Sequence, residues 1–217
     1  MEIKNLRDRI VQKLTGIVGY LLPLMSSLPP LAAWSGLMTV PFIVYLMLMF
    51  GNISVAPPTL PDYTRLENWV VLIVAALGFV LLLYSVIHLW RTKTGGLVTT
   101  GPYRFVRHPQ YFALIIFTTM MTYPSVWILR NTFGMGWLSA DQTLVLWYAT
   151  LFAYVAIAWI EEAHLDNTFG DEWKDYRQRV GFLIPLVRFR SNLVEGLLCA
   201  LIPIVIMQIL LGLPVIL

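Results

Sequence analysis

Two arginines, a histidine and two tyrosines stand together in Gly101-Pro102-Tyr103-Arg104-Phe105-Val106-Arg107-His108-Pro109-Gln110-Tyr111, between two long apolar runs. Hydrocarbon tolerates such groups only where they are buried in protein, lie at the interface or line a wet cavity. Another polar stretch, residues 161–179, separates the next pair of apolar runs. We call residues 101–111 and 161–179 the first and second polar segments. We predict that they meet on one face of a membrane and build a single site.

The composition is typical of a membrane protein. The 217 residues are 58% hydrophobic and 12% charged, whereas soluble domains carry about 25% charged residues. The net charge of +3 is small, and the basic residues cluster beside apolar runs, so we expect membrane lipids and no nucleic acid as partners. Cys199 is the only cysteine, which excludes an intramolecular disulfide and a cysteine-rich metal site.

Five apolar runs approach or exceed the roughly 20 residues that a membrane-spanning helix needs. They are residues 32–51, 69–90, 111–129, 143–160 and 193–217. Residues 14–28 are apolar but too short, and we expect a helix there that lies at the interface or is partly inserted. The predicted fold is therefore all-α and polytopic, with about five transmembrane helices and an N-terminal interfacial helix.

The orientation follows from the lysines and arginines, which favour the cytoplasmic side of short loops. If the five runs span and residues 14–28 do not, 13 of the 15 basic residues fall on one side and only Arg65 and Arg130 on the other. The sequence therefore predicts a cytoplasmic N-terminus and places both polar segments, with the single site they would build, on the cytoplasmic side.

The first polar segment offers a histidine at the start of a predicted span. Pro109 biases His108 away from helical backbone, as suits the residue before a helix. The residues themselves leave open whether His108 is a structural hydrogen bonder or a ligand contact. Neither His88 nor His164 stands at a metal-ligand spacing from it, so we expect no metal site.

The second polar segment opens with two carboxylates, Glu161 and Glu162, at the end of a predicted membrane helix. Such a pair is costly unless it is solvated or matched by positive charge, and anions are disfavoured at that end of a helix. A cationic ligand would explain it. Trp173 and Tyr176 follow, either as interfacial anchors or as part of an aromatic wall beside a cation.

The two polar segments resemble the isoprenylcysteine carboxyl methyltransferase family, which is similar to phospholipid methyltransferases and other small membrane methyltransferases. The residues that carry the resemblance are Leu97-Val98-x-x-Gly101-x-Tyr103-x-x-x-Arg107-His108-Pro109-x-Tyr111 and Glu161-Glu162-x-x-Leu165-x-x-x-Phe169-Gly170-x-x-Trp173-x-x-Tyr176. They lie within roughly residues 69 to 187. The resemblance implies an integral-membrane enzyme that uses S-adenosyl-L-methionine.

On this interpretation the chain has four parts. Residues 1–31 form the interfacial helix, residues 32–90 the N-terminal spans and residues 191–217 a C-terminal span. Residues 91–190 form the methyltransferase core, with cofactor-binding loops and a helical hairpin.

The resemblance also implies which residues form the site. The cofactor positions carried over from the family are Gly96, Leu97, Val98, Tyr103, His108, Pro109, Gln110, Tyr111 and Glu161, with His88 at a further polar position. We take Arg107 and Glu162 as the candidate catalytic residues. Arg107 would orient a polar group of the acceptor, and Glu162 would take a proton from a thiol or amine.

The acceptor is expected to be a small or medium lipophilic molecule that enters from the bilayer. Prenylcysteine enzymes carry a substrate-binding arginine one turn before the glutamate pair, where this chain has Ile157.

Two other functions remain as alternatives to a methyltransferase. One is a membrane sterol-type reductase that binds NADPH, and the other is a non-catalytic membrane scaffold that kept the fold. A carboxylate pair suits a sulfonium cation better than a phosphorylated dinucleotide.

Overall fold

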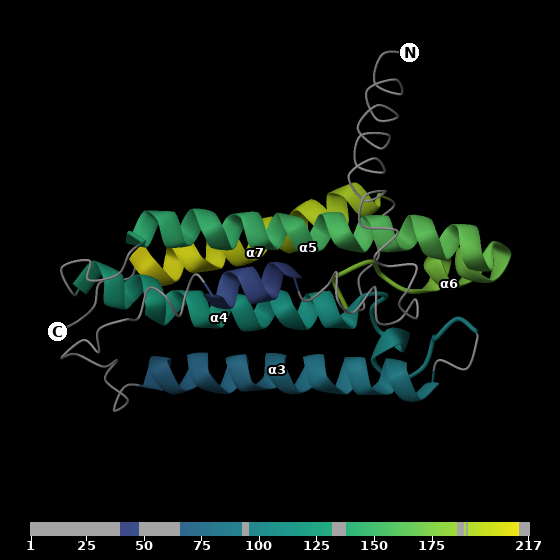
Figure 1. Cartoon of the computed structure of the whole chain (residues 1–217), viewed down its shortest axis with the longest axis horizontal. Helices are drawn as coiled ribbons and strands as arrows, with labels where there is room; N and C mark the ends of the chain where they lie inside the picture. The colour runs from purple at the N-terminus through teal and green to yellow at the C-terminus, as the bar shows by residue number, and fades with distance from the viewer. Residues whose placement is uncertain are drawn as a thin grey trace, which may run out of the picture. The chain divides into compact units, whose positions relative to one another are not determined.

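The computed structural model describes residues 40–47, 66–92, 96–131, 138–185, 189 and 191–212. The chain divides into two units, Met1–Val40 and Pro41–Leu217. The predicted interfacial helix within residues 1–31 lies outside the described residues, and the first predicted span is described only as a helix over residues 40–47. The other helices are α3 (Leu66–Thr92), the short 3-10 helix η1 (Gly101–Arg104), α4 (Pro109–Asn131), α5 (Ala140–Phe169), α6 (Asp171–Arg179) and α7 (Asn192–Gly212) (Figure 1).

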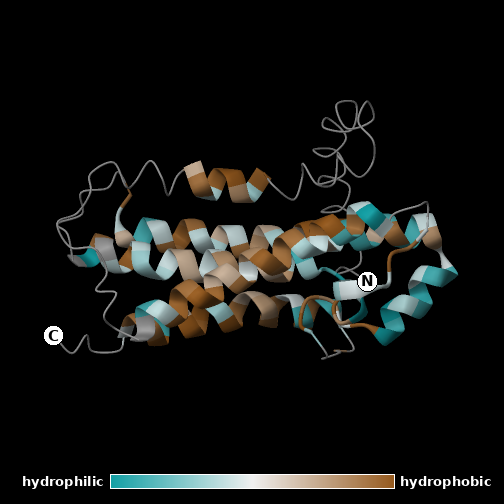
Figure 2. Ribbon diagram, turned by 90° about the horizontal axis from the view of Figure 1, so that it is seen from below, coloured by the Kyte–Doolittle hydropathy of each residue, from teal (hydrophilic) through white to brown (hydrophobic). Residues whose placement is uncertain are grey.

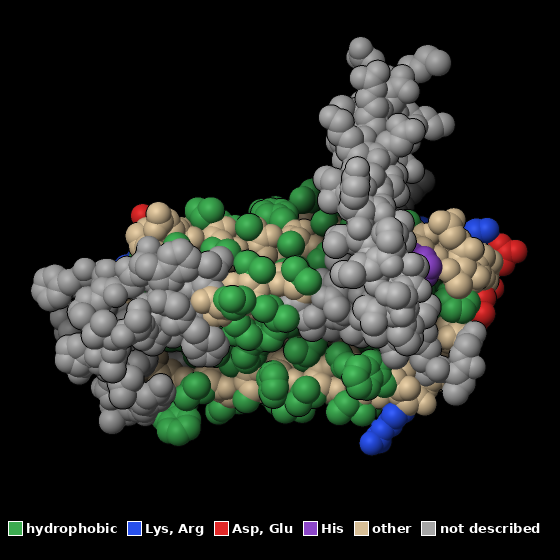
Figure 3. All heavy atoms as spheres, viewed as in Figure 1, with side chains coloured by type: hydrophobic (Ala, Val, Ile, Leu, Met, Phe, Trp, Pro, Cys, Tyr) green, Lys and Arg blue, Asp and Glu red, His purple; other side chains and the backbone are tan. Residues whose placement is uncertain are grey.

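The described part is all-helical apart from one isolated bridge between Val106 and Gly181. Three of its helices are long and apolar enough to cross a membrane, at Asn68–Thr92, Ala140–Phe169 and Asn192–Gly212. In Figure 2, brown and pale segments fill the middle of the long helices and teal segments lie towards their ends, whereas α6 is largely teal. On the face shown in Figure 3, charged side chains lie at the helix ends and hydrophobic ones between them. The all-α prediction is confirmed for the described residues, and three of their helices could cross a membrane by length and composition. The predicted count of five spans stays a prediction.

The long helices pack in a connected series. Helix α4 contacts α3, α5 and α7, and α5 also contacts α7. Glycines permit the closest approaches. A Cβ atom at Gly78 would lie 3.1 Å from Ile116 Cγ2, and one at Gly196 would lie 2.7 Å from Val155 Cγ1. Small residues at helix contacts are typical of membrane proteins, in which packing and interhelical hydrogen bonds drive association.

Helix α5 is longer than the sequence pattern predicted. The predicted span ended at residue 160, but the helix continues to Phe169 and stops at Gly170, which has a positive φ of 51°. Residues 161–169 contain neither Gly nor Pro, so nothing breaks the helix where it leaves the apolar region. Glu161 and Glu162 therefore lie inside α5. The prediction that they oppose the helix dipole is wrong, because that effect is confined to the last turn.

The first polar segment turns tightly before α4 begins. Gly101 has a φ of 61°, and a Cβ atom there would lie 2.6 Å from His88 Nε2, so both the backbone and the space require glycine. The Arg107 N–H donates to the Gly181 carbonyl at 2.9 Å. This bond joins the first polar segment to the loop that follows α6, and it fixes Arg107 and His108 beside α5.

Candidate functional site

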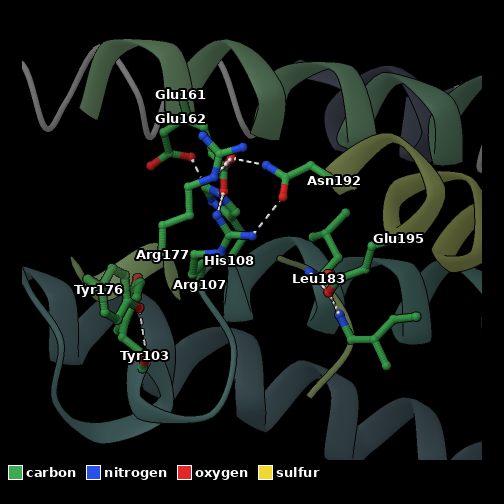
Figure 4. A network of polar contacts seen from close by, with 11 residues as sticks. Tyr103, Arg107, His108, Glu161, Glu162, Tyr176, Arg177, Leu183, Asn192 and Glu195 are labelled. Atoms are coloured by element: carbon green, nitrogen blue, oxygen red, sulfur yellow. Dashed lines mark hydrogen bonds and ion pairs between the residues drawn. The ribbon is translucent and has the colours of Figure 1, made fainter. Parts of the chain in front are cut away.

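A cluster of charged and polar side chains forms where the two polar segments meet the first turn of α7 (Figure 4). We call it the charged cluster, and its members are Arg107, His108, Glu161, Glu162 and Asn192. The loop before α4, the C-terminal part of α5 and the start of α7 each contribute. The predicted meeting of the two polar segments is therefore present in the structure.

Arg107 is the most heavily engaged residue of the charged cluster. Its Nη1 lies 2.5 Å from Glu162 Oε1, and its Nη2 donates to Asn192 Oδ1 at 3.1 Å. The guanidinium also lies over the rings of Trp173 and Phe182, at 5.9 and 5.5 Å from their centroids. Burial lowers the pKa of Arg107 and the nearby carboxylates oppose that shift, but an arginine stays charged. Nε remains without a hydrogen-bond partner among the described residues.

His108 is almost fully buried between the two carboxylates. Its Nδ1 lies 3.3 Å from Glu161 Oε2 and its Nε2 lies 3.6 Å from Glu162 Oε1. Burial acts to lower the pKa of His108, but the contacts and charges of Glu161 and Glu162 together outweigh it and raise the pKa above its ordinary value. When His108 is protonated, it and Arg107 place two positive charges against the two negative ones of Glu161 and Glu162.

The two carboxylates have different surroundings. Glu162 is 7% exposed, faces Arg107 Nη1, accepts a hydrogen bond from Asn192 Nδ2, and lies 4.0 Å from Arg177 Nε. Glu161 is 17% exposed, and its Oε2 accepts no hydrogen bond within the described part of the chain despite the contact with His108. Glu162 Oε1 likewise accepts no hydrogen bond among the described residues, but it forms the ion pair with Arg107. Glu161 is the more exposed of the two and faces His108 rather than an arginine, so it retains capacity for a further partner.

Several predicted cofactor positions lie around the charged cluster. The Tyr103 hydroxyl donates to Gln110 Oε1 at 3.0 Å, and the Tyr176 hydroxyl donates to the Tyr103 carbonyl at 2.6 Å. Burial raises the pKa of Tyr103 well above its ordinary value, so its hydroxyl stays a neutral donor. The Tyr111 ring lies 5.6 Å from the His108 ring. These contacts pin α6 to η1 and line the charged cluster with aromatic side chains.

The other predicted positions are more peripheral. Pro109 is the first residue of α4. His88 lies 3.0 Å from Thr100 Oγ1 through its Nε2 and stacks beside Tyr103. Leu97 and Val98 are half-buried and Gly96 is exposed, on the loop before η1. The structure therefore brings these three residues near the turn at Gly101 rather than into the charged cluster.

Two residues of this site were missed by sequence reasoning, Asn192 and Arg177. The sequence distinguishes Arg177 only as one of the 13 basic residues on the predicted cytoplasmic side. Asn192 opens α7, 30 residues after Glu162, and asparagine is common at helix starts for local capping reasons alone. Its only distinguishing signal was an amide at the edge of an apolar run.

Comparison with known proteins gives the same assignment for the middle of the chain. Residues 66–172 match the phospholipid methyltransferase family. Methanethiol S-methyltransferase 1 of Bradyrhizobium diazoefficiens is 35% identical over 83 residues, which are 38% of this chain and 24% of that protein. Protein-S-isoprenylcysteine O-methyltransferase of Schizosaccharomyces pombe is 34% identical over 99 residues, 45% of this chain and 36% of that protein.

The matched segment therefore spans about a quarter of one curated relative and about a third of the other. No solved structure matches the chain. The resemblance predicted from the two polar segments is confirmed: this chain is similar to membrane methyltransferases over the region that contains most of the charged cluster.

Proposed function

We propose that the protein is an integral-membrane methyltransferase that uses S-adenosyl-L-methionine to methylate a lipophilic acceptor. The observation that carries this proposal is the charged cluster, which places Glu161 and Glu162 beside His108 and Arg107 inside the segment that matches membrane methyltransferases. Both relatives are methyltransferases by name. The comparisons lend no support to the alternative of an NADPH-dependent reductase.

The residues present fit the chemistry of S-adenosyl-L-methionine. Bound, it supplies an electrophilic methyl group on a sulfonium cation and also presents an ammonium and a carboxylate. The Glu161 side chain is 17% exposed, and its buried Oε2 accepts no hydrogen bond among the described residues, which suits a cation. The rings of Tyr111 and Phe182 flank His108, and aromatic faces attract cations.

We assign the cofactor side of the site to the residues around Glu161. His108, Glu161 and Tyr111 would contact the cofactor directly, and Tyr103, Pro109 and Gln110 would support those residues. The backbone of Gly96, Leu97 and Val98 would form a loop against the polar edges of the cofactor. Backbone groups of a glycine-containing turn approach a ligand closely.

We assign the acceptor side to Arg107. Methyl transfer is an in-line displacement in which no covalent bond to the protein forms, so positioning and exclusion of water supply most of the acceleration. Arg107 is held by Glu162, Asn192 and two aromatic rings, and its free Nε–H is available to a polar group of the acceptor. Glu162 is occupied by Arg107 and Asn192, so we now assign it to holding Arg107 rather than to taking the acceptor proton.

The acceptor is best tested by direct competition. Ile157 is buried in α5 one turn before Glu161, where prenylcysteine enzymes carry an arginine, and nothing at that position pairs with a prenylcysteine carboxylate. We expect purified protein to methylate a long-chain thiol such as decanethiol faster than farnesylated cysteine, a long-chain amine or a phospholipid. Labelled S-adenosyl-L-methionine and organic extraction measure all four. Farnesylated cysteine turning over far above the others would contradict this acceptor class. Absence of any binding of the labelled cofactor would contradict the proposed function itself.

The location of the site gives a second prediction. We propose that it faces the cytoplasm, as the distribution of basic residues favours. Asp166 and Asp141 are both exposed and lie 25 residues apart on α5, roughly 38 Å along the helix axis. In a Cys199→Ala background, Asp166→Cys should react with an impermeant maleimide only from the cytoplasmic side and Asp141→Cys only from the opposite side. The reverse pattern would contradict the proposed orientation.

A further inference from the structure

We propose that Asn192, in the first turn of α7, is a positioning residue for methyl transfer, an inference that rests on the proposed function. Asn192 lies beyond residue 172, where the match to the methyltransferase family ends. Nothing in the two polar segments requires it. The structure nevertheless places its side-chain amide between Arg107 and Glu162 (Figure 4).

The amide of Asn192 has complementary contacts with both members of the ion pair. Its Oδ1 accepts from Arg107 Nη2 at 3.1 Å, and its Nδ2 donates to Glu162 Oε2. Arg107 Nη1 lies 2.5 Å from the other oxygen of the same carboxylate. The three side chains therefore close a ring in which the amide can adopt only one orientation, because a flipped amide would set donor against donor and acceptor against acceptor.

This ring restricts Arg107 more than Glu162 alone can. A guanidinium has five N–H groups and can face a carboxylate through more than one edge. With Nη1 toward Glu162 and Nη2 on Asn192, the edge that carries Nε stays free of partners among the described residues. In a buried site such a fixed arrangement is favoured, because hydrogen bonds there are strong and alternatives leave groups unpaired. Asn192 thus decides which edge of Arg107 is offered to the acceptor.

Two further contacts fix the position of Asn192. The carboxylate of Glu195, one turn later and 1% exposed, accepts from the backbone N–H groups of Leu183 and Ile184 at 2.9 and 3.0 Å. Gly196 allows α7 to approach Val155 of α5 closely. The first turn of α7 is therefore held against both the loop after α6 and α5.

The test compares Asn192→Ala and Asn192→Asp with Gln208→Ala in the full-length, detergent-solubilised protein. Gln208 is the matched control, since its amide also makes one cross-helix bond on α7 but lies 16 residues from Asn192. S-adenosyl-L-methionine is the methyl donor, and the acceptor is decanethiol or farnesylated cysteine, whichever the wild type methylates faster. We expect Asn192→Ala to lower kcat about tenfold or more, as for a lost charge-assisted bond. The Kd of Asn192→Ala for the cofactor should stay within about threefold of wild type. In Gln208→Ala, both kcat and the Kd for the cofactor should stay within the same range.

The pH profile separates positioning from simple loss of structure. In Asn192→Asp, the ionised carboxylate at position 192 would have no hydrogen to donate to Glu162 and would repel it. As the pH falls, two adjacent carboxylates share a proton, which restores a hydrogen bond between them. The ratio of Asn192→Asp to wild-type kcat should therefore rise by roughly fivefold between about pH 8 and about pH 5.5, while the ratio for Asn192→Ala stays flat. A kcat for Asn192→Ala within about threefold of wild type, or equal pH profiles for the two variants, would overturn the proposal. Wild type that binds no cofactor would instead overturn the proposed function, and this inference with it.

Discussion

Arg107→Leu is expected to lower the free energy of unfolding by about 3 to 5 kcal/mol, the usual cost of removing one partner from a buried ion pair. The Arg107 and Glu162 side chains are 2% and 7% exposed. Leucine fills much of the space but leaves the Glu162 carboxylate with only Asn192 and the more distant groups to oppose its charge. Denaturant unfolding in detergent, followed by tryptophan fluorescence, measures the change.

A double variant supplies the control for this prediction. Arg107→Leu with Glu162→Leu removes both charges, and replacing a whole buried pair by apolar residues is often close to neutral. The double variant should therefore recover most of the lost stability. Lys174→Leu is the surface comparison, because Lys174 pairs with Asp171 at 2.8 Å with both side chains largely exposed, and it should change stability little. A double variant as unstable as Arg107→Leu would show that packing, and not the unpaired charge, sets the cost.

The long helices could be predicted because hydrophobic runs that exceed the bilayer thickness have few alternatives to a helix. The predicted span at residues 69–90 became α3. The end of the apolar run in α5 was a poor guide to the end of the helix. Polar residues such as Glu161 continue a helix as readily as apolar ones, so only Gly170 could mark its end.

The meeting of Arg107 and His108 with Glu161 and Glu162 could also be predicted, because each pair stands at the same predicted membrane face and opposite charges in such surroundings need partners. The contribution of α7 could not. One amide at the start of an apolar run has a complete local explanation as a helix start, and its contacts depend on how α7 packs against α5. That register is set by the close approach of the two helices at Gly196. A single glycine in an apolar run forms no repeating pattern, so the sequence does not indicate where the helices meet.

Glu161→Gln is expected to weaken binding of S-adenosyl-L-methionine tenfold or more. Glu161 is the more exposed carboxylate of the charged cluster, and its Oε2 accepts no hydrogen bond among the described residues. A charge-assisted bond to a cation exceeds the roughly 1.4 kcal/mol that corresponds to tenfold in affinity. At a pH above the raised pKa of His108, His108→Ala should have an effect of similar direction, because the neutral imidazole orients Glu161 from 3.3 Å away. Equilibrium dialysis with the labelled cofactor measures both. Glu172→Gln, at an exposed position of α6, is the matched control.

Cofactor binding at Glu161 should also depend on pH, and the direction of the change can be worked out. Glu161 and Glu162 raise the pKa of His108, so His108 carries a proton over a wider pH range than an ordinary histidine, and that positive charge competes with a cationic ligand for the same carboxylates. Cofactor affinity in wild type should therefore rise as the pH increases through the raised pKa of His108. In Glu161→Gln one of the two charges that raise this pKa is gone, so the rise should move to lower pH and affinity should stay below wild type throughout. Wild-type affinity in both Glu161→Gln and His108→Ala would remove the cofactor site from the charged cluster.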